Sequence, residues 1–215
     1  MDKARDRADE LAGGDKPQVG SVTEAAPPPD RSAKASREAE TTMVMDQRAM
    51  ARAIKRLAHE IRERNQGQAL ALIGIVRRGV ALSQRLCELL KGMGFADVAV
   101  GALDISHYRD DDRRTDGDPR LLGRAIPFSL AGKTIVLVDD VLYTGRTVRA
   151  ALQALAELGR PKCVQLAVLV DRGERELPIR ADFVGRNVVA GEARRVYVRL
   201  AEIDGIDAVI VAPNS

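Results

Sequence analysis

The residues of this sequence best suited to chemistry are two adjacent acids and the Thr-Gly-x-Thr turn that follows them. Asp139 and Asp140 come directly after the apolar run 135–138, whose continuous, β-branched pattern predicts a strand buried on both faces. In open α/β sheets, ligands bind at the carboxyl ends of such strands. Residues 144–147 then offer threonine hydroxyls and a glycine backbone before an expected helix, whose N-terminal N–H groups favour anions. The segment therefore predicts a phosphate cradle beside a carboxylate pair, and a ribose 5-phosphate would satisfy both.

A second candidate anion site lies in the segment 74–79, GIVRRG, between an expected strand and an expected helix. Arg77 and Arg78 in this tight turn are suited to bind a pyrophosphate through charge-assisted hydrogen bonds. A solvated basic turn is the alternative interpretation.

Alternating strand and helix patterns must position these residues. We expect strands at 69–76, 97–105, 135–140 and 163–170, and helices over 46–65, 79–94 and from the Thr-Gly-x-Thr turn to about 158. After Asp171 the pattern is less regular, with extended candidates at 182–189, 195–203 and 207–212. This alternation predicts an α/β fold with a mostly parallel sheet flanked by helices.

Composition divides the chain into a tail and one domain. Residues 1–42 hold few large apolar side chains and include the run APPPD, so we expect a disordered N-terminal tail. Residues 43–215 are long enough for one well-buried domain. No apolar run approaches the roughly 18 residues that span a membrane. Cys87 and Cys163 are expected to be buried thiols of a cytoplasmic protein.

The segment 135–147 resembles the signature of the type I phosphoribosyltransferases: four apolar residues, two acids and then Thr-Gly-x-Thr. The resemblance implies the type I phosphoribosyltransferase fold with a small hood, and binding of phosphoribosyl pyrophosphate. Asp139 and Asp140 would hold the ribose hydroxyls, residues 143–147 would hold the 5-phosphate, and Mg²⁺ would arrive with phosphoribosyl pyrophosphate. The substrate-binding set implied in this way is Arg77, Arg78, Asp139, Asp140, Val141, Leu142, Tyr143, Thr144, Gly145, Arg146, Thr147, Arg172, Phe183 and Val184.

A long polar loop over residues 107–124 interrupts the expected domain. In the resembled family this loop closes over the bound substrate, which implies that Arg109 reaches the reacting atoms with it. Arg109, Asp139 and Asp140 are therefore the expected catalytic residues.

Three segments resemble the PyrR family, bacterial regulators of pyrimidine operons that also have uracil phosphoribosyltransferase activity. They are RLAHEIRERNQG at 56–67, DDVLYTGRTVRAAL at 139–152 and VQLAVLVDRGERELPIRADFVG at 164–185. The resemblance implies formation of UMP and pyrophosphate from uracil and phosphoribosyl pyrophosphate. It also implies UMP and UTP as nucleotide ligands, and a homo-oligomer.

The same resemblance implies a place for the base. Phe183 would pack on the uracil ring and the Val184 backbone would bind its edge, with Arg172 nearby. Ordinary core packing is the alternative for Phe183. Purine phosphoribosyltransferases usually carry an acid where this chain has Tyr143, so a purine substrate is disfavoured.

A basic stripe on the first expected helix suggests a second activity. Its members, at spacings of four, three, four and three, are Arg48, Arg52, Lys55, His59 and Arg62, with Arg56 and Arg64 beside them. Such a stripe is the electrostatic footprint of a nucleic-acid binder, although the net charge of +3 alone indicates none. PyrR proteins use a basic face to bind pyrimidine-operon messenger RNA in a manner that depends on uridine nucleotides. A solvated helix face is the alternative.

Two departures from the PyrR pattern bear on RNA binding. Arg77 stands where the family often has threonine, and Glu174 stands where it often has histidine. A carboxylate facing phosphates is repulsive. The sequence therefore supports either a regulator with uracil phosphoribosyltransferase activity or a uracil salvage enzyme that has lost RNA binding.

Overall fold

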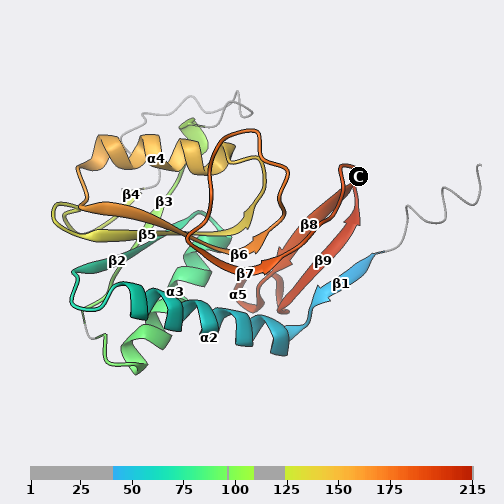
Figure 1. Cartoon of the computed structure of the whole chain (residues 1–215), viewed down its shortest axis with the longest axis horizontal. Coiled ribbons are helices and arrows are strands. Elements are labelled where there is room, and N and C mark those ends of the chain that lie inside the picture. Colours follow the sequence, from blue (N-terminus) through green and yellow to red (C-terminus); the bar gives the residue numbers. More distant parts are fainter. Residues whose placement is uncertain (1–40, 96, 109–123, 215) are drawn as a thin grey trace, which may run out of the picture.

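The computed structural model describes residues 41–95, 97–108 and 124–214, which fold into two sheets and four α-helices (Figure 1). The helices are α2 (Gln47–Arg64), α3 (Arg78–Gly92), α4 (Arg146–Leu158) and α5 (Ala201–Asp204), and a 3₁₀ turn, η1, spans Ser106–Tyr108. The expected tail up to residue 40 and most of the long loop lie outside the described residues. Within them, no helix is both long and apolar enough to cross a bilayer.

The larger sheet has six strands in the order β4-β3-β2-β5-β6-β7. They are β2 (Leu70–Ile75), β3 (Ala99–Leu103), β4 (Arg124–Ala125), β5 (Thr134–Leu142), β6 (Cys163–Asp171) and β7 (Phe183–Asn187). Every neighbouring pair is parallel except β3 with β4. The prediction of an α/β fold with a mostly parallel sheet is confirmed.

Helices cover both faces of this sheet, which explains the continuous apolar strands. Val136 and Val138 of β5 belong to the core beneath α2 and α3, whereas Ile135 and Leu137 belong to the core beneath α4. Successive side chains of a strand point to opposite faces of the sheet. Because both faces are covered here, side chains on both are buried, and residues 135–138 are all apolar.

The first long helix forms where its pattern predicted. The Asp46 side chain accepts a hydrogen bond of 2.7 Å from the Ala49 N–H, so Asp46 is the N-cap of α2. Four apolar residues at helical spacing, Met50, Ile54, Leu57 and Ile61, are buried against the sheet. Their burial stabilises the helix and leaves its other face to solvent.

A small antiparallel sheet, in the order β1-β9-β8, stands beside the larger one, and we call it the hood (Figure 1). Its strands are β1 (Thr42–Met45), β8 (Arg194–Arg199) and β9 (Ala208–Pro213). The sequence did not predict β1, which begins inside the segment 1–42 expected to be a disordered tail.

Three local expectations were wrong. β5 does not end at Asp140, because Val141 and Leu142 continue its pairing with β6. Residues 201–203, expected to be the end of an extended segment, belong to α5. Cys163 is exposed rather than buried, because it opens β6 at the amino edge of the sheet.

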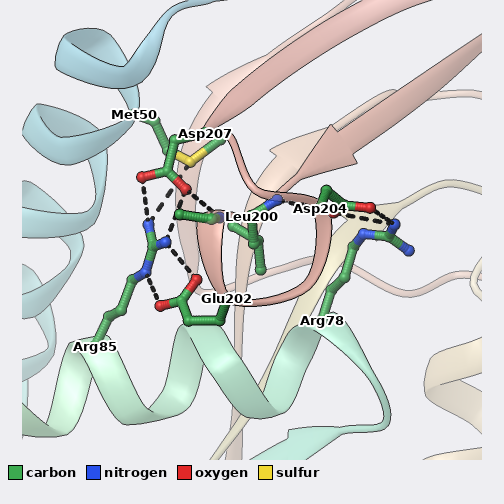
Figure 2. A network of polar contacts seen from close by, with 8 residues as sticks. Met50, Arg78, Arg85, Leu200, Glu202, Asp204 and Asp207 are labelled. Atoms are coloured by element: carbon green, nitrogen blue, oxygen red, sulfur yellow. Dashed lines mark hydrogen bonds and ion pairs between the residues drawn. The ribbon is translucent and has the colours of Figure 1, made fainter.

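An arginine on α3 holds the hood against the domain (Figure 2). The Arg85 guanidinium donates hydrogen bonds to Glu202, at 2.7 Å from Nε, and to Asp207, at 2.9 Å from Nη1 and 2.7 Å from Nη2. Glu202 and Asp207 flank the turn that joins β8 to β9. One side chain therefore fixes that turn on α3.

These hydrogen bonds shift the ionisation of all three groups. The bonds from Arg85 hold the pKa values of Glu202 and Asp207 below their ordinary range, and in return raise the pKa of Arg85. A carboxyl whose pKa is lowered by folding stabilises the native state above its ordinary pKa. This contribution disappears as the pH falls through the lowered native value.

Replacing Arg85 should therefore destabilise the protein in a pH-dependent way. We expect Arg85→Met to lower the free energy of unfolding by about 2 kcal/mol at neutral pH. Most of this loss should come from the bonds to Asp207, because solvent screens the more exposed Glu202 carboxylate. The loss should shrink in acid, below the ordinary pKa values of 4.5 for Glu202 and 3.8 for Asp207. Urea denaturation across this range measures it, with exposed Arg160→Met as control. An equal loss at every pH would contradict the electrostatic assignment.

Candidate active site

Three adjoining cavities open at the carboxyl end of β5, and all three are lined by Asp140. The first, of about 640 Å³, extends over residues 140–148 and is closed by side chains from the segment after β6 and from β8. The second, of about 550 Å³, lies between Arg78 and the hood. The third, of about 180 Å³, borders residues 75–78. Asp140 is therefore the meeting point of the site.

The two acids differ in their surroundings. Asp139 is 6% exposed, lines only the smallest cavity, and its Oδ1 accepts a hydrogen bond of 2.9 Å from the Asp140 N–H. Asp140 is half-buried and lies between the cradle and residues 76–78, which join β2 to α3 and which we call the arginine loop. Asp140 is thus placed to accept hydrogen bonds from ligand hydroxyls, while Asp139 orients the backbone beneath it.

The predicted phosphate cradle is the turn that leads into α4. Gly145 is the N-cap residue, with φ +94°, a left-handed conformation that favours glycine. A Cβ there would also lie 3.2 Å from the Ile179 side chain and 3.3 Å from Leu177. The first turn of α4 lines the largest of these cavities, and the N-terminus of a helix is where an anion is favoured.

The segment 171–179 braces this cradle from behind. The Arg175 guanidinium donates to the carbonyls of Tyr143, Gly173 and Ile179 at 2.8 to 2.9 Å, and to the Asp171 carboxylate at 2.6 Å. The Glu176 and Leu177 N–H groups both donate to the Thr144 carbonyl at 3.1 Å. These bonds hold the cradle backbone in place before any ligand arrives.

The arginine loop approaches β5 closely. A Cβ on Gly79 would lie 2.3 Å from the Val138 carbonyl oxygen, so only glycine allows α3 to begin directly against β5. The peptide bond between Val76 and Arg77 is cis. Arg77 is exposed, whereas Arg78 is half-buried and donates to the Asp204 carboxylate at 2.9 and 3.2 Å.

Arg172, which we expected near the base, packs against the cradle and is held by other protein groups. Its side chain is 5% exposed, and its guanidinium stacks over the Tyr143 ring at 3.9 Å from the centroid. It also donates to the Gly191 carbonyl at 2.9 Å and pairs with Glu174 at 3.1 Å. Arg172 therefore fixes Tyr143 of the cradle to the strand connection that leads into the hood.

The structure does not bring Phe183 and Val184 to the cavities. Phe183 is 3% exposed and belongs to the core beneath α2. The reason is strand register: Phe183 pairs with Ala167, four positions before β6 ends at Asp171. Core packing, the alternative considered for Phe183, is what the structure shows. Arg109 lies outside the described residues.

Two residues that the sequence did not single out line the site instead. Arg195 and Val196 of β8 border both larger cavities, opposite the cradle. The basic and alternating pattern of β8 predicted an extended segment, but no local signal shows which part of the domain that strand faces.

The residues of the expected RNA-binding stripe fall into two groups on α2. Arg48, Arg52, Lys55 and His59 are exposed. Arg62 is half-buried. Arg56 and Arg64 are also exposed, but they tie α2 to β7 and its neighbour Asp182. Arg56 donates to the Gly185 carbonyl at 2.6 Å, and Arg64 pairs with Asp182 at 2.9 Å and lies over the Phe183 ring.

Comparison with known proteins identifies the family. Residues 40–196 match the phosphoribosyl transferase domain family. The bifunctional protein PyrR of Pelotomaculum thermopropionicum is 53% identical over 173 residues, which cover 80% of this chain and 96% of that protein. The chain belongs to the PyrR family. The bifunctional protein PyrR of Acetivibrio thermocellus is 55% identical over 170 residues, covering 79% of this chain and 92% of the relative.

Solved structures confirm the fold of this PyrR-family chain. The hypoxanthine phosphoribosyltransferase of Trypanosoma cruzi, in a ternary complex with its substrates, has a TM-score of 0.64 at 22% identity, covering 82% of this chain and 96% of the other. The Staphylococcus aureus enzyme has a TM-score of 0.62 at 16% identity, covering 84% and 96%. At these identities the similarity concerns the fold alone, and the type I phosphoribosyltransferase fold is confirmed.

The bracing role of Arg175 can be tested in the protein without a ligand. We expect Arg175→Ala to speed amide hydrogen exchange at residues 142–148 by about tenfold or more, because the bonds to the Leu142 and Tyr143 carbonyls are lost together with those that hold the bracing segment. Exchange followed by mass spectrometry measures this. The matched control is Arg180→Ala, an exposed arginine of the same connection. Equal exchange in both variants would show that the cradle holds its shape without the brace.

Proposed function

We propose that this PyrR-family protein converts uracil and phosphoribosyl pyrophosphate to UMP and pyrophosphate, and regulates pyrimidine operon expression by uridine-nucleotide-dependent binding of messenger RNA. The position of Asp140 carries the enzymatic part of the proposal. It lies where the phosphate cradle, the arginine loop and the space beneath the hood meet. A sugar with a phosphate at one end and a pyrophosphate at the other requires this arrangement.

Each part of the substrate then has a place. The 5-phosphate binds the N–H groups and hydroxyls of the cradle at residues 144–147, and the ribose hydroxyls donate to Asp140. The pyrophosphate lies toward Arg77 and Arg78. Uracil N1 bonds to the anomeric carbon as the bond from that carbon to pyrophosphate breaks, and the N1 proton passes to the released pyrophosphate or to water. Binding both reactants in this alignment supplies much of the rate enhancement, and the carboxylates stabilise the cationic sugar at the transition state.

The acids present fit a magnesium ion that arrives with its substrate. Within the described residues, no group of three or more acidic, histidine or cysteine side chains is placed to hold a metal ion alone. Mg²⁺ is commonly bound by one or two carboxylates together with substrate phosphates, and Asp139 and Asp140 offer such a pair. When bound, the ion would neutralise charge that develops on the pyrophosphate.

We place the uracil beneath β8 rather than against Phe183. Among the described residues β8 is an edge strand of the hood and pairs with β9 alone, so its other edge offers backbone N–H and C=O groups to a ligand. Val196 on this strand lines the largest cavity. The imide edge of uracil carries the donors and acceptors that such a strand edge can pair.

Steady-state kinetics test the enzymatic proposal. We expect Mg²⁺-dependent UMP formation that Asp140→Asn lowers about 100-fold or more in kcat/KM, because the carboxylate orients the ribose and stabilises its cation. Asp139→Asn should lower it as well. Uracil should be used far better than hypoxanthine or guanine. Unchanged rates in both variants would exclude the ribose-binding role, and efficient purine turnover would exclude the choice of uracil.

The RNA-binding part of the proposal is supported by the exposed basic face of α2. Arg48, Arg52, Lys55 and His59 are exposed on a helix that packs on the sheet face opposite to α4. The Glu174 carboxylate pairs with the buried Arg172, which reduces the repulsion that it exerts on a nearby phosphate.

Removing two exposed cations of α2 that make no side-chain hydrogen bond or ion pair with the described residues should separate the two activities. We expect the double variant Arg52→Ala, Lys55→Ala to bind the leader RNA of the protein's own pyrimidine operon more weakly. The slope of log K against the logarithm of the salt concentration should become about 1.5 less steep, because two phosphate contacts are lost. Uracil turnover should survive. Filter binding with and without UMP measures this, with Arg160→Ala as control. Absence of RNA binding by the unmutated protein at low salt would favour a uracil salvage enzyme only.

A further inference from the structure

The turn between β8 and β9, residues 200–207, contacts α3 through two arginines, and we call it the hood turn (Figure 2). Arg85 binds its two flanking acids, Glu202 and Asp207, and Arg78 binds Asp204 near its centre. Arg78 and Arg85 are seven residues apart, which places them on one face of α3. Arg78 is also the first residue of α3 and the last of the arginine loop.

Asp204 is held rigidly before it meets Arg78. Its Oδ2 accepts a hydrogen bond of 2.9 Å from the Leu200 N–H, and this bond is the main reason that the pKa of Asp204 is lowered. The carboxylate is thus ionised at neutral pH, and the two ends of the hood turn are fixed by Arg85. Asp204 therefore cannot follow Arg78 if that side chain moves.

Only one of the three nitrogens of the Arg78 guanidinium forms hydrogen bonds with the described residues. Within the described chain, Nη2 alone donates hydrogen bonds, both to Asp204, and Nε is buried without a partner. Figure 2 shows the other terminal nitrogen directed away from Asp204. Arg78 and Asp140 together line the two smaller cavities, so the guanidinium lies beside the ribose-binding acid.

We propose that Asp204 is a positioning residue for pyrophosphate: it holds Arg78 at the cavity edge by Nη2 and leaves Nη1 for the anion. The inference rests on the proposed function, in which Arg78 binds the pyrophosphate. A long arginine side chain loses conformational freedom when it binds, and Asp204 imposes that restriction in advance. The bond also makes the pyrophosphate site depend on the hood, since removing the hood turn would release Arg78.

The test is Asp204→Asn, which keeps an oxygen for the Leu200 N–H and removes the charge that holds Arg78. We expect the KM for phosphoribosyl pyrophosphate and the Kd of inorganic pyrophosphate to rise about fivefold, with kcat within about twofold, because a partly exposed charge-assisted bond is lost. Glu202→Gln is the matched control. It lies on the same turn but contacts Arg85 instead of Arg78, and both constants should stay unchanged.

A double-mutant cycle with Arg78→Gln distinguishes positioning from a general effect on the hood. In the Arg78→Gln background, Asp204→Asn should have no further effect on either constant. An Asp204→Asn protein with unchanged constants, or with tighter pyrophosphate binding, would overturn the inference, the latter because Asp204 would then be a competitor. If Arg78→Gln itself changes neither constant, the pyrophosphate role of Arg78 in the proposed function fails together with this inference.

Discussion

The parallel pairing of β5 between β2 and β6 is the constraint on which the site depends. It places the loop after β2, the acids of β5 and the segment after β6 at one edge of the sheet. The close approach of Gly79 to the Val138 carbonyl completes this arrangement, because it brings the start of α3 against β5. The cradle, the arginine loop and the hood, to which we assign the phosphate, the pyrophosphate and the base in the proposed function, then lie around Asp140 at adjoining cavities.

Arginine side chains convert that arrangement into a fixed geometry. Arg175 holds the cradle backbone, Arg172 covers Tyr143, and Arg85 fastens the hood turn to α3. Each of them contacts at least one segment that lies far from it in the sequence: Arg175 the Tyr143 carbonyl, Arg172 the Tyr143 ring, and Arg85 the carboxylates of Glu202 and Asp207. A guanidinium suits this work because its planar fork binds several acceptors at once and remains charged at every pH of interest. The positive charge of these arginines is therefore structural, and the net charge alone does not show how much charge is left for a partner.

This use of arginine also separates the two proposed activities on α2. Arg56 and Arg64 belong to the basic segment of that helix but bind β7 and its neighbour Asp182. Arg52 and Lys55 are exposed and available to an external phosphate. Substituting the exposed pair tests RNA binding without disturbing the sheet that carries the proposed catalytic acids.

The sequence by itself determined the parts that depend on local pattern. The buried strands, the Asp46 cap, the cradle before α4 and the arginine loop all follow from residue types at short spacing, and the signature at 135–147 indicates the family. Only the tertiary structure decided which distant segments meet. Phe183 lies in the core because of its register with β6, and Arg195 faces the cradle because the hood folds over it. Arg78 and Asp204 are 126 residues apart in the chain, and their contact depends on packing that no local pattern encodes.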